Sequence, residues 1–408
     1  MRVGLVSGVT VDVAVVGAGP VGGVLACLLA RAGVRVALID RAPLPPMEHR
    51  DFDGRAYAIA AGSRPVLEAA GLWDLLPFPA GAIRDIRVSD GRIGRAASPL
   101  FLHFDAREAG EAAFGWMVEA RSLRMALNRA LLDQPGLEVF APAEVAVTRA
   151  ADGVRLAIAG GPVIAARLVV GAEGRDSPLR RAAGIATSRI DYGQVGMVGA
   201  IAHERPHGGT ALEHFLPAGP FAQLPMAGTE GAPNLSAFVW TERTATARRL
   251  LALDDARFGT ELARRMGGHL GAVRVMGRRW SYPLSAMHAH RYTAERLALV
   301  GDAAHGVHPI AGQGLNLGLR DASALARLVT AEIGAGGDPG AASMLARYQA
   351  ARRPDNLMML AATHVLDKLF SNDAAPVRLA RDLGIAAVHR IPPLKRLFMR
   401  QAMGALTG

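Results

Sequence analysis

Cysteine is nearly absent from the sequence. Its 408 residues include only Cys27, so an intramolecular disulfide is excluded and a zinc site with several thiolate ligands is not expected. Because Cys27 stands in an apolar stretch with helical character, we expect it to pack in the core. There are 12 histidines, but none has the spacing of metal ligands, and His288 with His290 is predicted to lie in a surface loop. We predict no metal site.

Long hydrophobic runs and a high aromatic content are also missing. No apolar run reaches the roughly 18 residues that a membrane span needs, and the first ten residues lack the layout of a signal peptide, so we predict a cytoplasmic protein. Aromatic residues make up 5%, and no basic run is interleaved with them. The net charge of +10 therefore does not indicate nucleic-acid binding. The length favours about two domains.

A glycine-rich turn follows the first predicted strand. The apolar run 11–16 leads into Gly17, Ala18, Gly19, Pro20, Val21 and Gly22, and a helical pattern then extends to about Arg31. Glycines at these positions allow a tight turn, close approach to a pyrophosphate and close helix packing, while the start of the helix attracts phosphate. A second strand, 34–39, ends at Asp40 and Arg41, where a carboxylate accepts the ribose hydroxyls. The pattern predicts an adenine dinucleotide site, for either NAD or FAD.

The residues after Asp40 favour FAD. An NAD domain would continue as alternating strands and helices, whereas here a proline-rich loop, helices over 63–70 and 122–132, and β-type alternation from 145 to 158 interrupt the pattern. A strand at 168–171 then leads into a second phosphate-side loop that contains Glu173 and several arginines. We expect a nucleotide domain with insertions.

A second glycine-rich segment carries the decisive pattern. The apolar strand 296–300 ends in Gly301, Asp302, Ala303, Ala304 and His305, and the run from His308 to Leu319 follows. This segment resembles the FAD-binding segment of class A flavoprotein monooxygenases. The resemblance implies that Asp302 binds the ribityl chain and that the loop 309–314 lies against the isoalloxazine ring. Gly312 and Gly314 would let backbone N–H groups approach the flavin, and the helix from Leu315 to about Val329 would direct its positive end there.

The resemblance also implies a set of residues near the cofactor. Glu173 stands where family members commonly have aspartate, which places its carboxylate one methylene further out. No side chain is singled out as a general base, and His305 is expected to act as a structural hydrogen-bonding residue on the cofactor side. Beyond the glycine turn, Asp40, Arg41, Gly301 and Asp302, the expected positions are Arg55, Arg121, Glu173, His308, Pro309, Gly312, Gln313, Gly314, Leu315 and Asn316.

Further stretches are similar to one branch of that class, the hydroxylases of ubiquinone biosynthesis. They are Gly54–Ile59, Tyr282–Leu284, Arg352–Asn356, Phe370–Asn372 and, most specifically, His308–Asp321. The resemblance implies hydroxylation of a polyprenylated phenol by O₂ through a flavin C4a-hydroperoxide, with NAD(P)H as a transient electron donor or with another donor. Two alternatives remain open: a soluble flavin hydroxylase of a small aromatic acid, and a non-catalytic FAD-binding scaffold of a biosynthetic complex.

The expected fold is α/β, with a Rossmann-like FAD-binding domain of the glutathione-reductase type. Residues 11–80, 115–184 and 283–365 would form that domain, and residues 81–114 and 185–282 an inserted, mainly antiparallel substrate sheet. A helical region would occupy residues 366–408. Core packing is the default expectation for Phe221, Met226, Trp240 and Trp280, although they are also candidates to line the substrate pocket.

The C-terminal segment is basic. Residues 383–408 contain four cations and no acidic residue, and apolar residues recur there at near-helical spacing. The pattern predicts an amphipathic helix that either lies on an anionic membrane surface or packs on the flavin domain with a solvated basic face. Expected partners are a hydrophobic prenylated phenol, O₂, other ubiquinone-biosynthesis proteins and the inner face of a membrane, to which the cytoplasmic protein would bind peripherally.

Overall fold

The nucleotide domain is built on a six-stranded sheet. The computed structural model describes residues 8–44, 53–91, 93, 101–308, 312–370 and 392–404. The strand order is β19-β20-β13-β2-β3-β9, and the strands from β20 to β9 are parallel to their neighbours. The strands are β2 (Val13–Val16), β3 (Val36–Ile39), β9 (Leu137–Phe140), β13 (Leu168–Gly171), β19 (Thr293–Ala294) and β20 (Leu297–Leu299).

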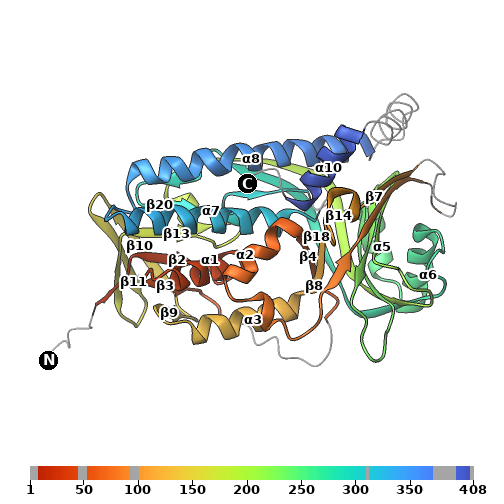
Figure 1. Ribbon diagram of the computed structural model, residues 1–408, viewed down its shortest axis with the longest axis horizontal. Coiled ribbons are helices and arrows are strands. Elements are labelled where there is room, and N and C mark those ends of the chain that lie inside the picture. Colours follow the sequence, from red (N-terminus) through yellow and green to blue (C-terminus); the bar gives the residue numbers. More distant parts are fainter. Residues whose placement is uncertain are drawn as a thin grey trace.

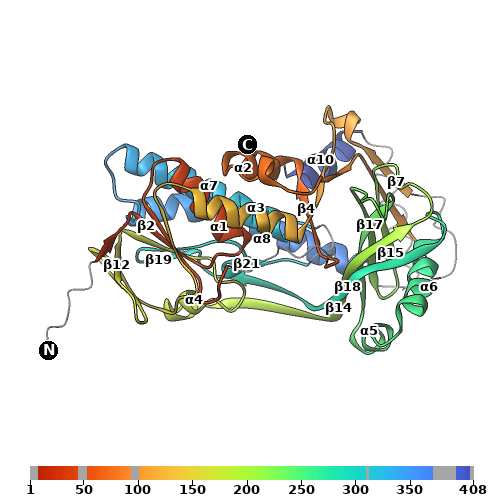
Figure 2. The same cartoon turned by 90° about the horizontal axis from the view of Figure 1, so that it is seen from below.

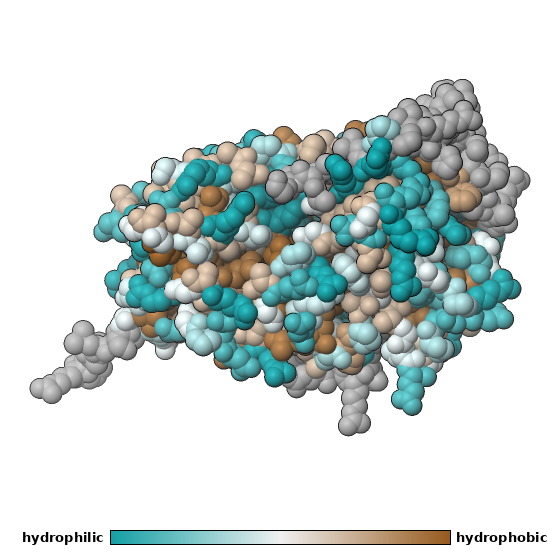
Figure 3. All heavy atoms as spheres, viewed as in Figure 1, coloured by the Kyte–Doolittle hydropathy of each residue, from teal (hydrophilic) through white to brown (hydrophobic). Residues whose placement is uncertain are grey.

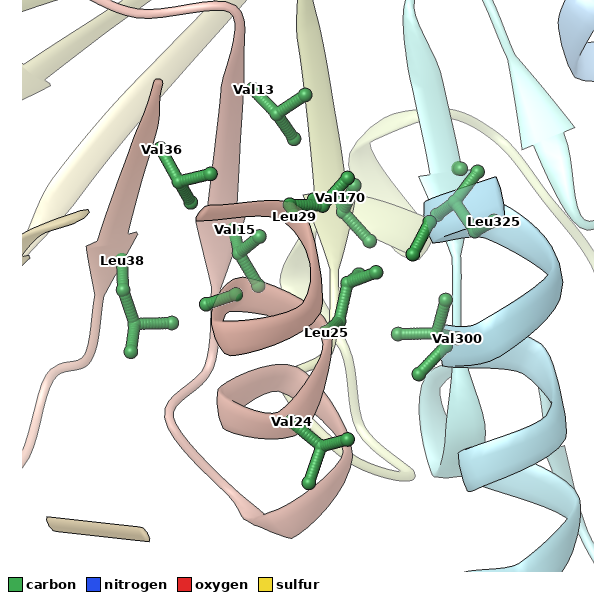
Figure 4. Packing of buried hydrophobic residues seen from close by; sticks show 14 of the residues in the cluster. Val13, Val15, Val24, Leu25, Leu29, Val36, Leu38, Val170, Val300 and Leu325 are labelled. Atoms are coloured by element: carbon green, nitrogen blue, oxygen red, sulfur yellow. The ribbon is translucent and has the colours of Figure 1, made fainter. Parts of the chain in front are cut away.

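Helices cover this sheet and bury its central strands. All residues of β2, β3, β13 and β20 are buried, which explains their uninterrupted apolar sequences. Figure 4 shows Leu25 and Leu29 directed toward Val170 and Val300, and Cys27 is buried in the same cluster, as expected. On the face shown in Figure 3, apolar residues gather in a hollow at the level of α1 and α7. The long helices are α1 (Pro20–Arg31), α3 (Ala120–Asp133), α7 (Gly314–Gly334) and α8 (Ala342–Phe370).

Two smaller sheets flank the nucleotide domain, one in the order β1-β12-β11-β10 and one in the order β4-β8-β5. Their strands are β1 (Val9–Thr10), β10 (Val145–Ala150), β11 (Gly153–Ile158) and β12 (Val163–Ala166), then β4 (Ala56–Ala60), β5 (Gly81–Ile83) and β8 (Gly115–Glu119). The short helices are η1 (Ala61–Ser63), α2 (Arg64–Ala69), η2 (Trp73–Leu75), η3 (Ala106–Ala109), α4 (Pro178–Ala182) and η4 (Gly301–Ala303).

A large sheet forms the second half of the molecule, in the order β21-β18-β14-β17-β16-β15-β6-β7. All of its pairings except β15 with β6 are antiparallel. The long strands β14 and β18 extend from this sheet toward the nucleotide domain (Figures 1 and 2). The strands are β6 (Asp85–Asp90), β7 (Phe101–Asp105), β14 (Thr187–His203), β15 (Thr210–Leu216), β16 (Gly219–Met226), β17 (Leu235–Arg243), β18 (Val273–Ala289) and β21 (His305–Gly306).

The two faces of the large sheet have different neighbours. Helices α5 (Thr244–Leu251) and α6 (Asp255–Met266) cover one face, where Phe221 and Trp240 are fully buried beside Phe258. Met226 lies in another apolar cluster, which includes Met117 of β8 and is packed against by Ala58 of β4. Phe221 and Trp240 are therefore core residues, in agreement with the default expectation.

The α/β prediction is confirmed, and one local prediction is wrong. His288 was expected in a surface loop, but it is buried in β18 opposite His305 of β21, because β18 continues to Ala289 and gains a strand partner that is distant in sequence. The same long strand crosses the proposed domain boundary at residue 282. We retain the three-part division as a proposal.

The described part of the C-terminal region packs against the protein. Helix α10 (Pro392–Met403) buries Met399 and Met403 in the same cluster as Met226, and Lys395 forms an ion pair with Glu108 at 2.7 Å. Of the basic segment 383–408, in which an amphipathic helix was predicted, residues 383–391 and 405–408 lie outside the described part of the chain. Within that part, none of the helices has both the length and the apolar character that a membrane-spanning helix needs.

Candidate functional site

The first glycine turn has the geometry of a phosphate-binding loop. Gly17 has φ +110°, and a Cβ there would lie 2.4 Å from the carbonyl oxygen of Ala172. A Cβ on Gly22 would lie 2.0 Å from the Gly17 oxygen, whereas one on Gly19 would meet nothing within 4 Å. Gly17 and Gly22 thus allow close packing, and Gly19 leaves open space. Since no side chain caps the start of α1, its first N–H groups are available to phosphate.

Asp40 lies directly beside this turn. Its Oδ2 accepts a hydrogen bond from the Ala18 N–H at 2.7 Å, and its Oδ1 accepts one from the Ala42 N–H at 2.9 Å. Arg124 of α3 donates from Nη1 to the Ala18 oxygen at 2.8 Å, and burial lowers the pKa of Arg124. Arg124 could not be chosen from the sequence, because a single arginine within an amphipathic helix carries no distinguishing pattern.

The second glycine-rich segment meets the first at Val21. Gly301 has φ +58°, and a Cβ there would lie 3.2 Å from Val21 Cγ2. A Cβ on Gly318 of α7 would lie 2.4 Å from the same methyl group. Asp302, next to Gly301, is half-exposed and lies 3.2 Å from Nε of Arg175. The fold therefore brings Asp302 to the start of α1, although about 280 residues separate the two motifs.

A buried carboxylate holds this junction together. Asp321 Oδ2 accepts hydrogen bonds from the Gly301 N–H at 3.1 Å and from His305 Nε2 at 2.5 Å. Its Oδ1 accepts from Arg352 Nε at 2.8 Å and from Asn356 Nδ2 at 3.1 Å. Burial opposes ionisation, but the charges and hydrogen bonds of His305 and Arg352 outweigh it and lower the pKa of Asp321 to about 2. His305 is thus a structural hydrogen-bonding residue, as expected.

The loop before α7 is attached to β4 by Asn316. The Asn316 Oδ1 accepts a hydrogen bond from the Ala60 N–H, and its Nδ2 donates to the oxygens of Ala58 and Gly312. Gly312 has φ +60°, and a Cβ on Gly314 would meet nothing within 4 Å. Gln313 is buried and precedes the first turn of α7. Leu315 is half-buried on that turn, and Pro309 lies outside the described residues. Asn316 therefore positions the loop through its side chain.

His308 is buried between the large sheet and α8. Its Nε2 lies 3.7 Å from Asp367 Oδ1, and Tyr192 meets the imidazole edge-on with 4.8 Å between ring centroids. Burial lowers the pKa of His308, which favours the neutral ring. These contacts connect the segment before the loop to the end of α8.

Arg55 lies where β4 and β18 meet. It pairs with Asp53 at 2.7 Å, and its guanidinium lies 4.3 Å from the ring centroid of Trp280. Arg278 stacks on Trp280 at 4.4 Å, and the indole N–H of Trp280 donates a hydrogen bond to the backbone carbonyl oxygen of Asp53. Trp280 therefore links two parts of the chain, and Arg55 lies at the seam between the nucleotide domain and the large sheet.

These features form a cradle that fits FAD. The uncapped start of α1, the open space at Gly19, the carboxylates of Asp40 and Asp302, and the start of α7 have the donors and acceptors that a flavin dinucleotide requires. Among the residues that the structure describes, no three His, Cys, Asp or Glu side chains gather as a metal-ligand set.

A model of the FAD binding domain family matches residues 10–361. The chain belongs to this FAD-binding family. Family membership confirms FAD as the cofactor and confirms the resemblance to FAD-dependent monooxygenases, so the protein is an FAD-dependent monooxygenase.

Relatives of this flavoprotein span nearly its whole length. A Rhodospirillum rubrum protein named ubiquinone hydroxylase UbiL is 52% identical, covering 97% of this chain and 90% of that protein. The Escherichia coli protein named 3-demethoxyubiquinol 3-hydroxylase is 35% identical, with 96% and 98% covered. Among solved structures, pqsL from Pseudomonas aeruginosa, described as a probable FAD-dependent monooxygenase, has a TM-score of 0.74 at 26% identity, covering 93% of this chain and 100% of that one.

Two residues predicted to bind FAD have other partners in this flavoprotein. Arg121 is buried, pairs with Glu119 at 2.5 Å and stacks on Phe78. Glu173 accepts hydrogen bonds from the hydroxyl of Ser177 and from the Leu179 N–H at the start of α4, and burial raises its pKa. Glu173, whose side chain is one methylene longer than the aspartate common in the family, therefore hydrogen-bonds to the first residues of α4. Cofactor contacts for both residues remain predictions.

The close approach at Val21 predicts that Gly318→Ala weakens FAD binding. The new methyl group would displace Val21 and with it the start of α1, at a cost of about 1 to 3 kcal/mol, so FAD affinity should fall by about ten-fold or more. Gly334→Ala is the matched control on the same helix, since its Cβ would meet nothing within 4 Å. Flavin fluorescence titration of the apoprotein measures both affinities. Equal FAD affinity in the two variants would contradict the role given to Val21.

The network around Asp321 predicts a large effect of Asp321→Asn on folding. The substitution removes the negative charge that His305 and Arg352 contact, so that Arg352 keeps only Asp355, at 2.8 Å, as a buried carboxylate partner. Loss of this charge from the buried network should lower the free energy of unfolding by about 3 to 5 kcal/mol. Urea denaturation monitored by circular dichroism measures the change. Asp176→Asn is the control, because Asp176 forms an exposed pair with Arg189 and its loss should cost at most about 1 kcal/mol.

We expect low pH to destabilise the folded protein through protonation of Asp321. The pKa of Asp321 is lowered from 3.8 to about 2 in the folded protein. The stabilisation by ionised Asp321 is therefore complete at pH values above the pKa of the unfolded state, 3.8, and is lost as the pH falls toward 2. Its size is on the order of 2 kcal/mol. We expect the urea midpoint of the wild type to fall across this range and that of Asp321→Asn to change less. Parallel pH profiles for the two proteins would argue against the network.

Proposed function

We propose that this protein hydroxylates the aromatic ring of a polyprenylated phenol in ubiquinone biosynthesis, with FAD and O₂. The observation that carries the proposal is the convergence of the Gly17 turn, Asp302 and the Gly312 loop on one cofactor cradle. Chain-long similarity to two hydroxylases named for ubiquinone or ubiquinol supports the choice of substrate class.

The cofactor would be held at both ends. The N–H groups at the start of α1 would bind the pyrophosphate, Asp40 the adenosine ribose and Asp302 the ribityl chain. The start of α7, held to β4 by Asn316, would direct its partial positive charge toward the flavin ring. FAD, once bound and reduced by the electron donor, would activate O₂ so that one of its oxygen atoms is added to an electron-rich ring and the other leaves as water.

The protein would orient the phenol and exclude water from it. One face of the large sheet is apolar, with Met226, Leu235 and Ala237 in a cluster that also includes Met117 of the neighbouring sheet β4-β8-β5. This buried apolar wall, which Met399 and Met403 of α10 also contact, would lie behind a pocket for a prenylated ring, and exclusion of water limits the unproductive release of H₂O₂. Arg55 and Trp280, at the seam, are placed to order the boundary between this wall and the cofactor cradle.

Electrons would come from a transient donor. The glycine turn at Gly17 is the one dinucleotide loop identified in the sequence, and it is assigned to FAD. NAD(P)H would accordingly bind only briefly, or a partner protein of the same pathway would deliver electrons. Because a polyprenylated substrate partitions into lipid, we infer that the protein acts peripherally at the inner face of the membrane.

The direct test uses purified FAD-loaded protein, a chemical or enzymatic reductant, and two phenols in separate reactions. Mass spectrometry should detect a product that is one oxygen atom heavier from a short-chain prenylphenol, and little product from 4-hydroxybenzoate. Rapid turnover of 4-hydroxybenzoate alone would favour a soluble aromatic-acid hydroxylase. If neither phenol is hydroxylated and O₂ is consumed no faster than by free flavin, a scaffold role would replace the proposal.

A further inference from the structure

One side of helix α8 is exposed and apolar. Leu357, Met358 and Val365 are 43%, 50% and 61% exposed. Asp355 and Asp367, which stand in the same stretch, are buried, so no charged side chain is exposed between Arg353 and Lys368. An apolar surface of this kind commonly marks an interaction site. The α8 row comprises Pro354, Leu357, Met358, Ala361, Ala362 and Val365.

A groove lies beside the row, between α8 and the ribbon formed by β14 and β18. Its volume is about 400 Å³. Its walls are mainly apolar, and its basic groups come from α8, from β18 and from the turn after β18. The residues that line the α8 groove are Ser188, Ile190, Ala286, His288, His290, Arg353, Leu357 and Leu360.

The lining of the groove contains the cation Arg353 and no acidic residue. Among the described residues, Arg353 has no carboxylate partner, and its Nε is buried without a hydrogen-bond acceptor. Burial, together with the nearby charge of Arg353, lowers the pKa of His288 to about 4. His290 and Arg291 are exposed at the adjoining turn. An amphipathic ligand with an anionic group would match both the walls and the charge.

The groove is separate from the cofactor cradle. Ser285 of β18 contacts Arg175, and Arg175 pairs with Asp302 on the cofactor side. Ala286, the next residue, lines the groove. Since neighbouring side chains in a strand point to opposite faces, the ribbon separates the α8 groove from the cradle.

We propose that the α8 row and groove form a docking surface for an anionic phospholipid bilayer. A headgroup phosphate would accept hydrogen bonds from Arg353, and Leu357, Met358 and Val365 would enter the boundary between headgroups and acyl chains. This proposal rests on the proposed function, because a lipid-borne phenol requires the enzyme at the membrane.

Charge and shape favour a bilayer over a second copy of the chain. An exposed apolar row along a helix, with cations beside it, is the pattern of a helix that lies in the membrane interface. A two-fold dimer through the same surface would bring two sets of cations together with no carboxylate from the groove between them. Figure 1 shows α8 along one edge of the molecule, a position from which it can meet a flat surface.

Vesicle sedimentation of the FAD-loaded protein tests the proposal. Equimolar phosphatidylcholine and phosphatidylglycerol vesicles should bind the wild type more tightly than phosphatidylcholine alone. The double variant Met358→Asp, Val365→Asp should bind the mixed vesicles roughly ten-fold more weakly or worse, and Arg353→Gln about five-fold more weakly. Leu132→Asp is the matched control, since Leu132 is an apolar residue of α3 that is 72% exposed, and it should bind as the wild type does.

A fluorescent label provides a second measurement. The protein's single cysteine is buried, so Met358→Cys and Leu132→Cys each provide one accessible thiol for an environment-sensitive dye. We expect mixed vesicles to shift the emission of the dye at residue 358 to the blue and to leave the dye at residue 132 unchanged. Equal shifts at both positions would contradict docking through α8.

The outcomes separate this proposal from the proposed function. Hydroxylation of a short-chain prenylphenol in solution should be the same in the wild type and the α8 variants, because none of the changed residues touches the cradle. Vesicle binding that persists in the double variant overturns the docking surface even if hydroxylation is confirmed. A change from dimer to monomer in the double variant, with vesicle binding unaltered, would assign the row to self-association and also overturn it.

Discussion

Asp321 accepts hydrogen bonds from the backbone at the start of η4, from His305 after it, and from two side chains of α8. An unpaired buried carboxylate would be strongly unfavourable, so these donors together stabilise the fold. The position of Asp302 follows from this requirement, because η4 is fixed to α7 and α8 through one side chain. The cofactor cradle therefore depends on a charge that is not itself part of its surface.

Four glycines allow the elements around the cofactor cradle to pack closely. Val21 lies against Gly301 and Gly318, and Gly17 and Gly22 allow the turn to pack on β13. A side chain at any of these positions would push the start of α1 or the turn before it away from the end of β13, from η4 or from α7. The open space at Gly19 then remains on the cradle side, where a pyrophosphate would lie.

The ribbon of β14 and β18 gives the molecule two functional sides. One side carries Ser285 and, through Arg175, reaches Asp302, whereas the other side faces α8. If α8 rests on a bilayer, a lipid-borne substrate need travel only around the ribbon to reach the apolar face of the large sheet. The packed methionines of α10 are consistent with this arrangement, since they contribute to the core and leave α8 as the exposed apolar helix of the described chain.

The sequence by itself determined the dinucleotide turn, the choice of FAD and the α/β fold, because glycine spacing and apolar periodicity report local backbone shape and burial. It also indicated Asp40, which directly follows the strand β3, and the resemblance to class A flavoprotein monooxygenases implied Asp302. Only the tertiary structure decided that Arg124 contacts the turn, that Arg121 and Glu173 have protein partners, and that His288 belongs to a strand. It also decided that Asp321 joins three elements and that Arg353 faces a groove. Each of these depends on side chains brought together from distant positions by strand order and helix packing, and local patterns in a sequence carry no information about that pairing.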